Sequence, residues 1–488
     1  MGAKQGNCHY EIERNQRANL TSRGGLLPAV ELWHRSNLSE LANEIIGKRP
    51  HRGFEDGIQA RALMLLNFSG FDAVDDLDVL RADKGLCDLL DLIDRREGVR
   101  RCGCPVPSPS AFRAWLDAVG GDAACLQGVR AMNTHLLTWL QERCPERIAT
   151  IDMDATYMPT KKGEAKWSYK GERANQSMNA YWAERDMMLF TEYREGNVNP
   201  GAQHLEMLQN ALECLPQGVE KVRLRTDTAG YVANLLRYCN EGQSPWGVID
   251  FAISCPVTAA LRREVCKLES QAWQPLDESG GQEWAEVNFV PSSLSTSKKS
   301  PKYRFLVLRS PAALSDAEKP DVCQLTFEEM AAHIDDLEQA HPRVRKLHLT
   351  VLDGKIWKIF AIVTNLHDMP GEDVIRWQRA RCGRAEEMHA ILKNDLAGGH
   401  VPSASFGASA AWWHLTVLAL NLQKVLLLHV LPSGWGRVRQ KRLLATLYAI
   451  PGRISRHARK TILTPAGHFA HIAEEALKAL PQFCENTA

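Results

Sequence analysis

The chain has 488 residues, 44% of them hydrophobic, and exceeds the roughly 250 to 300 residues at which single cores stop growing. Its 59 basic and 58 acidic residues nearly balance, which excludes a uniformly basic protein and confines any nucleic-acid affinity to local patches. Thirteen scattered cysteines without a C-x-x-C pair, and a polar start without an apolar leader, lead us to expect a cytoplasmic protein with reduced thiols and no signal peptide.

Residues 1–145 are predicted to form a helical N-terminal DNA-binding region. Apolar residues recur at helical spacing through most of this stretch, and patterns typical of strands are nearly absent. Ser108 and Pro109 supply a cap and an early proline, which predicts that a helix begins there.

From residue 146 the pattern predicts an α/β core in which strands and helices alternate. Acidic and apolar residues alternate over 148–157, and a second strand-like run over 222–227 ends in an aspartate. We assign residues 146–245 and 371–430 to the two parts of this core and 246–370 to a mainly β insertion. Residues 431–488 are predicted to form a basic helical region. The apolar stretch 411–431 is interrupted by polar residues, so we interpret it as a buried helix and expect no membrane span.

Acidic residues recur on the predicted core elements. Asp152 and Asp154 share one face of their strand because side chains alternate, and two carboxylates there favour a cation. Asp227 ends the second strand, and Glu386 lies on a later helix. A lone strand-end aspartate more often caps a loop, but three acids on separate elements supply the oxygen ligands that Mg²⁺ prefers.

The helix that carries Glu386 has a polar face. Glu386, His389 and Lys393 fall at positions i, i+3 and i+7, so one carboxylate could hold a metal ion while the lysine contacts a nearby phosphate. The alternative is an ordinary solvated helix face.

These motifs together resemble the bacterial insertion-sequence DDE transposases (transposase DDE domain group 1). Asp152-Met153-Asp154-Ala155-Thr156 looks like their D-x-D-x-T motif, and the stretch 225–231 is similar to their second-aspartate element. Gly383-Arg384-Ala385-Glu386, continued to Lys393, resembles the helix with their glutamate and lysine. The resemblance covers about residues 65–462.

This resemblance implies an RNase H-like catalytic core, interrupted by a β insertion between the second aspartate and the glutamate. It implies Asp154, Asp227 and Glu386 as catalytic residues and ligands of two Mg²⁺ ions, with Mn²⁺ as a substitute and Asp152 as an alternate ligand. Related transposases place a tyrosine and an arginine seven and four residues before the glutamate, where this chain has Arg379 and Cys382. Arg381 and Arg384 are therefore the candidate substitutes for contacting DNA.

Two further stretches are candidate DNA contacts. No acidic residue occurs over 433–460, where the basic residues include Arg453, Arg456 and Arg459, and such a stretch can neutralise phosphates. The loop after the first catalytic strand mixes basic and aromatic residues: Lys161, Lys162, Lys166, Lys170 and Arg173 with Trp167 and Tyr169. That mixture can grip a DNA backbone and stack on an unpaired base, although a surface hairpin with ordinary cross-strand aromatics explains it equally well.

We therefore predict a transposase that cuts the terminal inverted repeats of its own element and joins them to target DNA. The expected partners are double-stranded DNA and further copies of the chain in a homodimer or multimer, associated with the bacterial nucleoid when bound to DNA. The alternatives are an RNase H-like nuclease without strand transfer and a domesticated DNA-binding protein.

Overall fold

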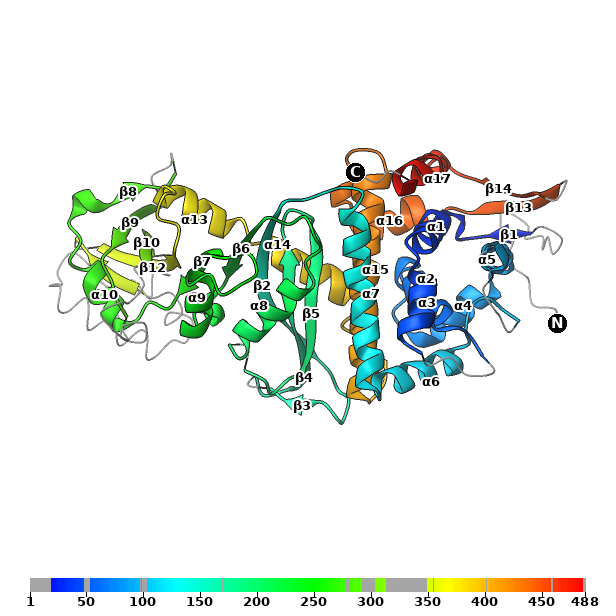
Figure 1. Cartoon of the computed structure of the whole chain (residues 1–488), viewed down its shortest axis with the longest axis horizontal. Coiled ribbons are helices and arrows are strands. Elements are labelled where there is room, and N and C mark those ends of the chain that lie inside the picture. The colour runs from blue at the N-terminus through cyan, green and yellow to red at the C-terminus, as the bar shows by residue number, and fades with distance from the viewer. Residues whose placement is uncertain are drawn as a thin grey trace, which may run out of the picture. The chain divides into compact units, whose positions relative to one another are not determined.

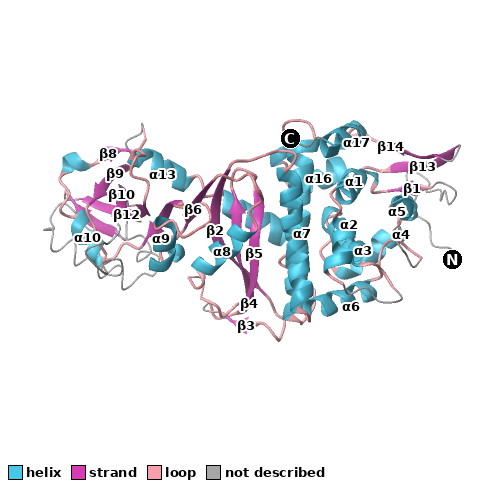
Figure 2. Cartoon of the chain, viewed as in Figure 1, coloured by secondary structure: helices cyan, strands magenta, loops and turns pink. Residues whose placement is uncertain are grey.

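A computed structural model of the chain describes residues 19–47, 53–96, 98, 103–168, 170–199, 201–277, 281–291, 303–312, 349–353, 355–400, 402–457 and 460–485. They form two compact units: unit 1 joins Met1–Met132 with Ile391–Thr487, and unit 2 is Asn133–Ala390. Figure 2 shows that unit 1 is chiefly helical, whereas unit 2 holds most of the strands. We predicted separate regions for residues 1–145 and 431–488, but the blue and the orange-to-red elements of Figure 1 belong to one unit.

Unit 1 is built around one apolar helix. Its helices are α1 (Leu27–Arg35), α2 (Leu38–Ile45), α3 (Asp56–Phe68), α4 (Leu77–Ala82), α5 (Lys84–Arg96), α6 (Pro109–Gly120), α15 (Phe406–Val425), α16 (Gln440–Leu443) and α17 (Ala470–Glu485). Helix α7 (Ala123–Gln141) runs across the boundary between the units. Phe406–Val430 is long and apolar enough to cross a membrane, but 89% of its most apolar window is buried, as expected for a core helix. Helix α15 packs closely on α6, because a Cβ on Gly407 would lie 1.9 Å from the carbonyl oxygen of Gly120.

The C-terminal basic stretch forms strands where we predicted helices. Strands β1 (Leu20–Thr21), β13 (Gly452–His457) and β14 (Lys460–Pro465) make a three-stranded antiparallel sheet, in the order β1-β13-β14. The prediction was wrong because basic residues suit an exposed strand as well as a solvated helix, and the deciding partner, β1, lies more than 400 residues away in the sequence. Elsewhere in residues 431–488 the helical prediction agrees with α16, with the helical turn Leu444–Tyr448 and with α17.

Unit 2 contains one large mixed sheet, which agrees with the predicted α/β class. Its strands are β2 (Ile148–Pro159), β3 (Lys166–Trp167), β4 (Arg173–Trp182), β5 (Met187–Glu195), β6 (Lys221–Thr226), β7 (Asp250–Cys255), β8 (Gln274–Pro275), β9 (Glu283–Val287), β10 (Arg304–Pro311), β11 (Leu349–Leu352) and β12 (Lys355–Thr364). Its helices beyond α7 are α8 (His204–Glu213), α9 (Ala233–Asn240), α10 (Ala259–Val265), α13 (Gly371–Arg379) and α14 (Arg384–Ala390).

The centre of this sheet has the order β5-β4-β2-β6-β7. Strands β2, β4 and β5 form an antiparallel meander, and β6 and β7 then continue parallel to β2. Helix α8 packs against β4 and β5, and α9 packs against β7. Parallel strands need crossover connections, and here α8 lies between β5 and β6 along the chain, and α9 lies between β6 and β7.

The predicted β insertion extends this sheet. Strand β12 pairs antiparallel with β7, and β10, β9 and β8 follow outward. Residues 292–302 and 313–348, which connect these strands, lie outside the described residues. Helix α13 buries Val374 and Ile375 against an apolar cluster on these strands, and Gln378 of α13 donates to Ser254 of β7 at 3.0 Å. The insertion thereby holds α13, which leads directly to the segment bearing Glu386.

Candidate active site

The pairing of β2 with β6 places Asp154 and Asp227 side by side. The last paired residues are Met153 and Thr226, and each aspartate comes next on its strand. Asp227 directly follows β6 and caps the next 3₁₀ turn, accepting a hydrogen bond from the amide of Ala229 at 3.0 Å. Two carboxylates from strands far apart in sequence therefore meet at one edge of the paired region.

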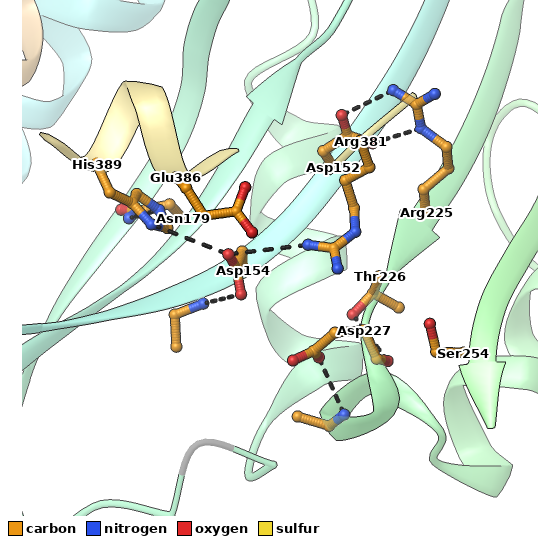
Figure 3. Close-up of polar contacts among 12 residues, drawn as sticks. Asp152, Asp154, Asn179, Arg225, Thr226, Asp227, Ser254, Arg381, Glu386 and His389 are labelled. Carbon is orange, nitrogen blue, oxygen red and sulfur yellow. Dashed lines mark hydrogen bonds and ion pairs between the residues drawn. The ribbon is translucent and has the colours of Figure 1, made fainter. Parts of the chain in front are cut away.

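Glu386 approaches the same place from α14. The chain turns sharply between α13 and α14 at Gly383, whose φ of +82° favours glycine. Glu386 lies in the first turn of α14, and its carboxylate accepts a hydrogen bond from the amide of Gly383 at 2.7 Å. Figure 3 shows its side chain extending from α14 toward Asp154, with Asp227 on the other side of Asp154.

Asp152 has a different environment from Asp154. It is buried, and its two carboxylate oxygens accept hydrogen bonds from Arg225 at 2.6 and 2.7 Å. The same guanidinium donates to the carbonyl of Trp377 at 2.6 Å, which ties β6 to α13. Burial raises the pKa of Asp152, and the ion pair with Arg225 opposes that rise. The structure therefore favours Asp154 over the alternate ligand Asp152, whose contacts position the helix that precedes Glu386.

A buried polar chain leads to Asp154 from β5 and β4. Thr191 donates to the side-chain oxygen of Asn179 at 2.6 Å, and the Asn179 amide lies 3.0 Å from Nε2 of His389. Because that amide donates to Nε2, the proton of a neutral His389 sits on Nδ1, which faces Asp154 at 3.9 Å. Sequence reasoning identified His389 by its spacing and missed Asn179 and Thr191. The sequence signal for Asn179 is that four of the five residues from 175 to 179 are polar inside a strand, all four of them buried; Thr191 has no such signal.

Arg381 is the cation nearest to Asp154. Its Nη1 lies 3.8 Å from the Asp154 carboxylate, and its side chain is buried. The pKa of Asp154 is raised to about 6: burial is the largest cause, the charge of Arg381 opposes the rise, and the negative charges of Asp227 and Glu386 add to it. The three acids therefore interact electrostatically, and one nearby guanidinium does not offset the cost of holding them together.

A cavity of about 200 Å³ opens at the two aspartates. Asp154, Asp227, Tyr157, Lys170 and His204 are among its lining residues. Burial lowers the pKa of His204, so this histidine is neutral near pH 7. Within the described residues no three His, Cys, Asp or Glu side chains are arranged closely enough to hold a metal ion by themselves. The cavity is therefore lined by two carboxylates and a lysine, a combination suited to a metal-bound phosphate group.

Comparison with known proteins gives the family. Residues 10–305, more than half of the chain, match the family described as transposase DDE domain group 1. The chain belongs to this family. The matched range includes Asp154 and Asp227 and ends before Glu386, so the role of Glu386 stays a prediction from the local motif. The predicted membership of the DDE transposases is confirmed, and a transposase of the DDE type acts on DNA. The bacterial insertion-sequence origin stays a prediction.

Two other comparisons add little detail. No curated protein matches the chain. Among solved structures, the chain is similar to a piggyBac transposase in a synaptic complex with hairpin DNA, with 10% identity, a TM-score of 0.35 and coverage of 87% of this chain and 79% of that one.

The remaining predicted site residues of this DDE transposase lie in several places. Arg384 forms ion pairs with Asp186 and, at 3.2 Å, with Glu387. Lys162 and Lys170 lie in the segment between β2 and β4 and are exposed. In unit 1, Lys393 follows α14 in a π-helical turn (Ile391–Asp395), and Arg453 and Arg456 are exposed on β13. Arg459 lies outside the described residues.

Proposed function

We propose that this protein is a metal-dependent DNA transposase that cleaves the terminal inverted repeats of an insertion sequence and transfers the ends to target DNA. The observation that carries the proposal is the convergence of Asp154, Asp227 and Glu386 from β2, β6 and α14. Burial, together with the charges of Asp227 and Glu386, raises the pKa of Asp154, and holding these carboxylates together is costly unless a cation offsets it.

The donor set fits Mg²⁺, which takes oxygen ligands and keeps several waters and substrate phosphate oxygens around it. Three carboxylates that do not close into a complete cage suit such an ion, because they leave room for water and for phosphate oxygens. Asp154, Asp227 and Glu386 would hold two ions, with Mn²⁺ as a substitute. When bound, such ions stabilise the attacking and leaving oxygens of an in-line displacement.

The chain's own side chains orient the reacting groups. Asn179 and His389 fix the Asp154 carboxylate from one side, and Arg381 fixes it from the other. The Nε atom of Arg381 is buried without a hydrogen-bond partner, so this guanidinium retains a donor for a substrate phosphate. Water would attack in the first step, and the freed 3′-hydroxyl would attack target DNA in the second.

The strand order supports an RNase H-like core. Three antiparallel strands followed by two parallel strands, with the first two acids on β2 and after β6, provide the scaffold expected from the family resemblance. In this reading β7 is the last core strand, so the insertion begins after residue 255 and not at 246.

DNA contacts are proposed on both units. Near the acids, Arg381 and Lys170 are the best placed, whereas Arg384 is already engaged by two carboxylates. In unit 1, Lys393, Arg453, Arg456 and Arg459 remain candidates. We also propose that the protein acts as a homodimer or multimer in the cytoplasm, because both ends of an element must be cut and joined together.

The function is tested with two neighbouring glutamates. A plasmid carrying the DNA that flanks this gene serves as donor, and cleaved and joined products are measured with Mg²⁺ and with EDTA. Glu386→Gln should lower cleavage by at least about a hundredfold, because removing a metal ligand costs more than the 10 to 100-fold typical of its supporting residues. Glu387→Gln is the matched control, since Glu387 pairs with Arg384, and should retain most activity.

The reverse ranking would remove Glu386 from the site. Cleavage without any joined product would favour the nuclease alternative, and DNA binding without cleavage under all metals would favour the domesticated DNA-binding protein.

A further inference from the structure

The segment that joins β2 to β4 presents an unusual tryptophan. Trp167 is 62% exposed, whereas the other twelve tryptophans are buried or only partly exposed. A single exposed apolar side chain is common on protein surfaces. What matters is therefore how Trp167 is held and what surrounds it.

Trp167 is held in a fixed position. It pairs with Arg173 across β3 and β4, and the Arg173 guanidinium lies over the indole, 5.6 Å from the ring centroid. Arg173 also donates to the carbonyls of Gly163 and Ala165, which closes the loop before β3. One face of the indole is thus supported while much of the ring stays in solvent, so a flat partner could stack on it with little loss of side-chain freedom.

The same segment is connected to the active-site cavity. The Lys170 ammonium lies 4.3 Å from the centroid of the Tyr157 ring, and the Tyr157 hydroxyl is 2.6 Å from that of Ser168. Tyr157 and Lys170 line the cavity together with Asp154 and Asp227. A chain leaving the cavity past Lys170 would therefore pass along the segment that carries Trp167.

The charge of this segment suits a DNA backbone. Over residues 160–173 there are five basic side chains and two acidic ones. Aromatic rings interleaved with cations are the features that bind single-stranded nucleic acid, because every base offers a flat face and every phosphate a negative charge. Double-stranded DNA hides its base faces, so it could use the cations but not the indole.

The sheet register gives the distance. Asp154 pairs with Asn179 and Trp167 pairs with Arg173, six residues along β4, which is roughly 20 Å along the strand. At about 3.4 Å per stacked nucleotide this distance corresponds to about six nucleotides, and to fewer in an extended strand.

We propose that Trp167 is a stacking platform for an unpaired base of the DNA strand that leaves the cleavage site, about three to six nucleotides from the scissile phosphate. The proposal rests on the proposed function, because that function places the scissile phosphate at Asp154 and Asp227.

The test measures binding by the full-length protein in EDTA, so that no cleavage occurs. The probes are a thymidine oligomer of about 16 nucleotides with one 2-aminopurine, and a blunt duplex of the same length. Trp167→Ala should weaken binding of the single strand about tenfold and abolish quenching of the 2-aminopurine fluorescence, while leaving the duplex unaffected. Trp167→Phe, which keeps a flat ring, should restore most of both signals.

Lys166→Ala is the matched control, since Lys166 is the exposed neighbour of Trp167 and carries a charge but no ring. It should weaken both probes and flatten their salt dependence, whereas Trp167→Ala should leave the salt dependence unchanged. In a duplex with a single-stranded flank, quenching should peak when 2-aminopurine is about three to six nucleotides from the junction. Unchanged single-strand binding by Trp167→Ala, or equal losses on both probes, would overturn the proposal. Because binding is measured without metal, a failure of catalysis would not be mistaken for a failure of stacking.

Discussion

At the scale of single residues, the two aspartates of the D-x-D motif have different tasks. Asp152 is neutralised by Arg225 and links the sheet to α13, whereas Asp154 faces the cavity and the other acids. Spacing could not separate them, because both side chains project from the same face of β2. The separation depends on Arg225, which is 73 residues away and pairs with Asp152 through the parallel register.

The raised pKa of Asp154 predicts that metal affinity depends on pH. Below pH 6 the carboxyl group is protonated in the metal-free protein, and an incoming cation must displace that proton. We expect the dissociation constant for Mn²⁺ to be about tenfold higher at pH 5 than at pH 7.5, with little change above pH 7. Isothermal titration calorimetry measures this directly.

The same shift has a consequence for stability. The folded-state pKa of Asp154 lies above the ordinary value of 3.8 for an aspartate, so the folded protein binds more protons and loses stability as the pH rises from about 4 to 6. Asp154→Asn should remove that loss, so at pH 7 the variant should unfold at a higher temperature than the wild-type protein.

For the metal, a dissociation constant that does not vary between pH 5 and 7 would contradict the assigned position of Asp154.

At the scale of elements, the sequence was informative where periodicity is local. The alternation in β2 and the strand that ends at Asp227 were predicted, as was the buried character of α15. Contacts between residues far apart in the sequence were not predicted. The contact of Asn179 with His389 spans 210 residues, and neither residue carries a local sign of it. The insertion was predicted as β, but its continuity with the core sheet depends on β12 pairing with β7.

The β13–β14 hairpin permits a test of the basic stretch in unit 1. Arg453 and Arg456 are exposed and point to opposite faces of β13, because side chains alternate along a strand. If each contacts a phosphate, replacing each by alanine should lower the slope of log affinity against log salt by about 0.9. The two losses should add, since the side chains share no partner.

Filter binding or fluorescence anisotropy at several salt concentrations gives these slopes. Arg95→Ala is the control, because Arg95 is a similarly exposed arginine of unit 1, in an ion pair with Asp91. Equal effects from all three arginines would show a general loss of charge rather than contact with DNA.

At the scale of the whole molecule, the two units differ in how the chain builds them. Unit 2 is one continuous stretch, Asn133–Ala390, whereas unit 1 needs both ends of the chain. We predict that a fragment of residues 123–390, which keeps all of α7, folds alone and unfolds in one cooperative thermal transition. It should bind Mn²⁺ with an affinity close to that of the full chain, since Asp154, Asp227 and Glu386 all belong to unit 2.

Circular dichroism and calorimetry check this prediction. The complementary fragment 391–488 is the control and should remain unfolded, because α15 would lack α3 and α6 as packing partners. An unfolded fragment 123–390 would mean that unit 2 depends on unit 1 for its stability.

The long separation between the second and third acids has a consequence during protein synthesis. Glu386 follows Asp227 by 159 positions, and at about 5 to 20 residues per second a ribosome needs roughly 8 to 32 seconds to add them. If the three proposed acids are all required, a nascent chain that already displays Asp154 and Asp227 is unable to cut DNA. Messages truncated before Glu386 would then release inert products, and the proposed activity would arise only when four-fifths of the translation is complete.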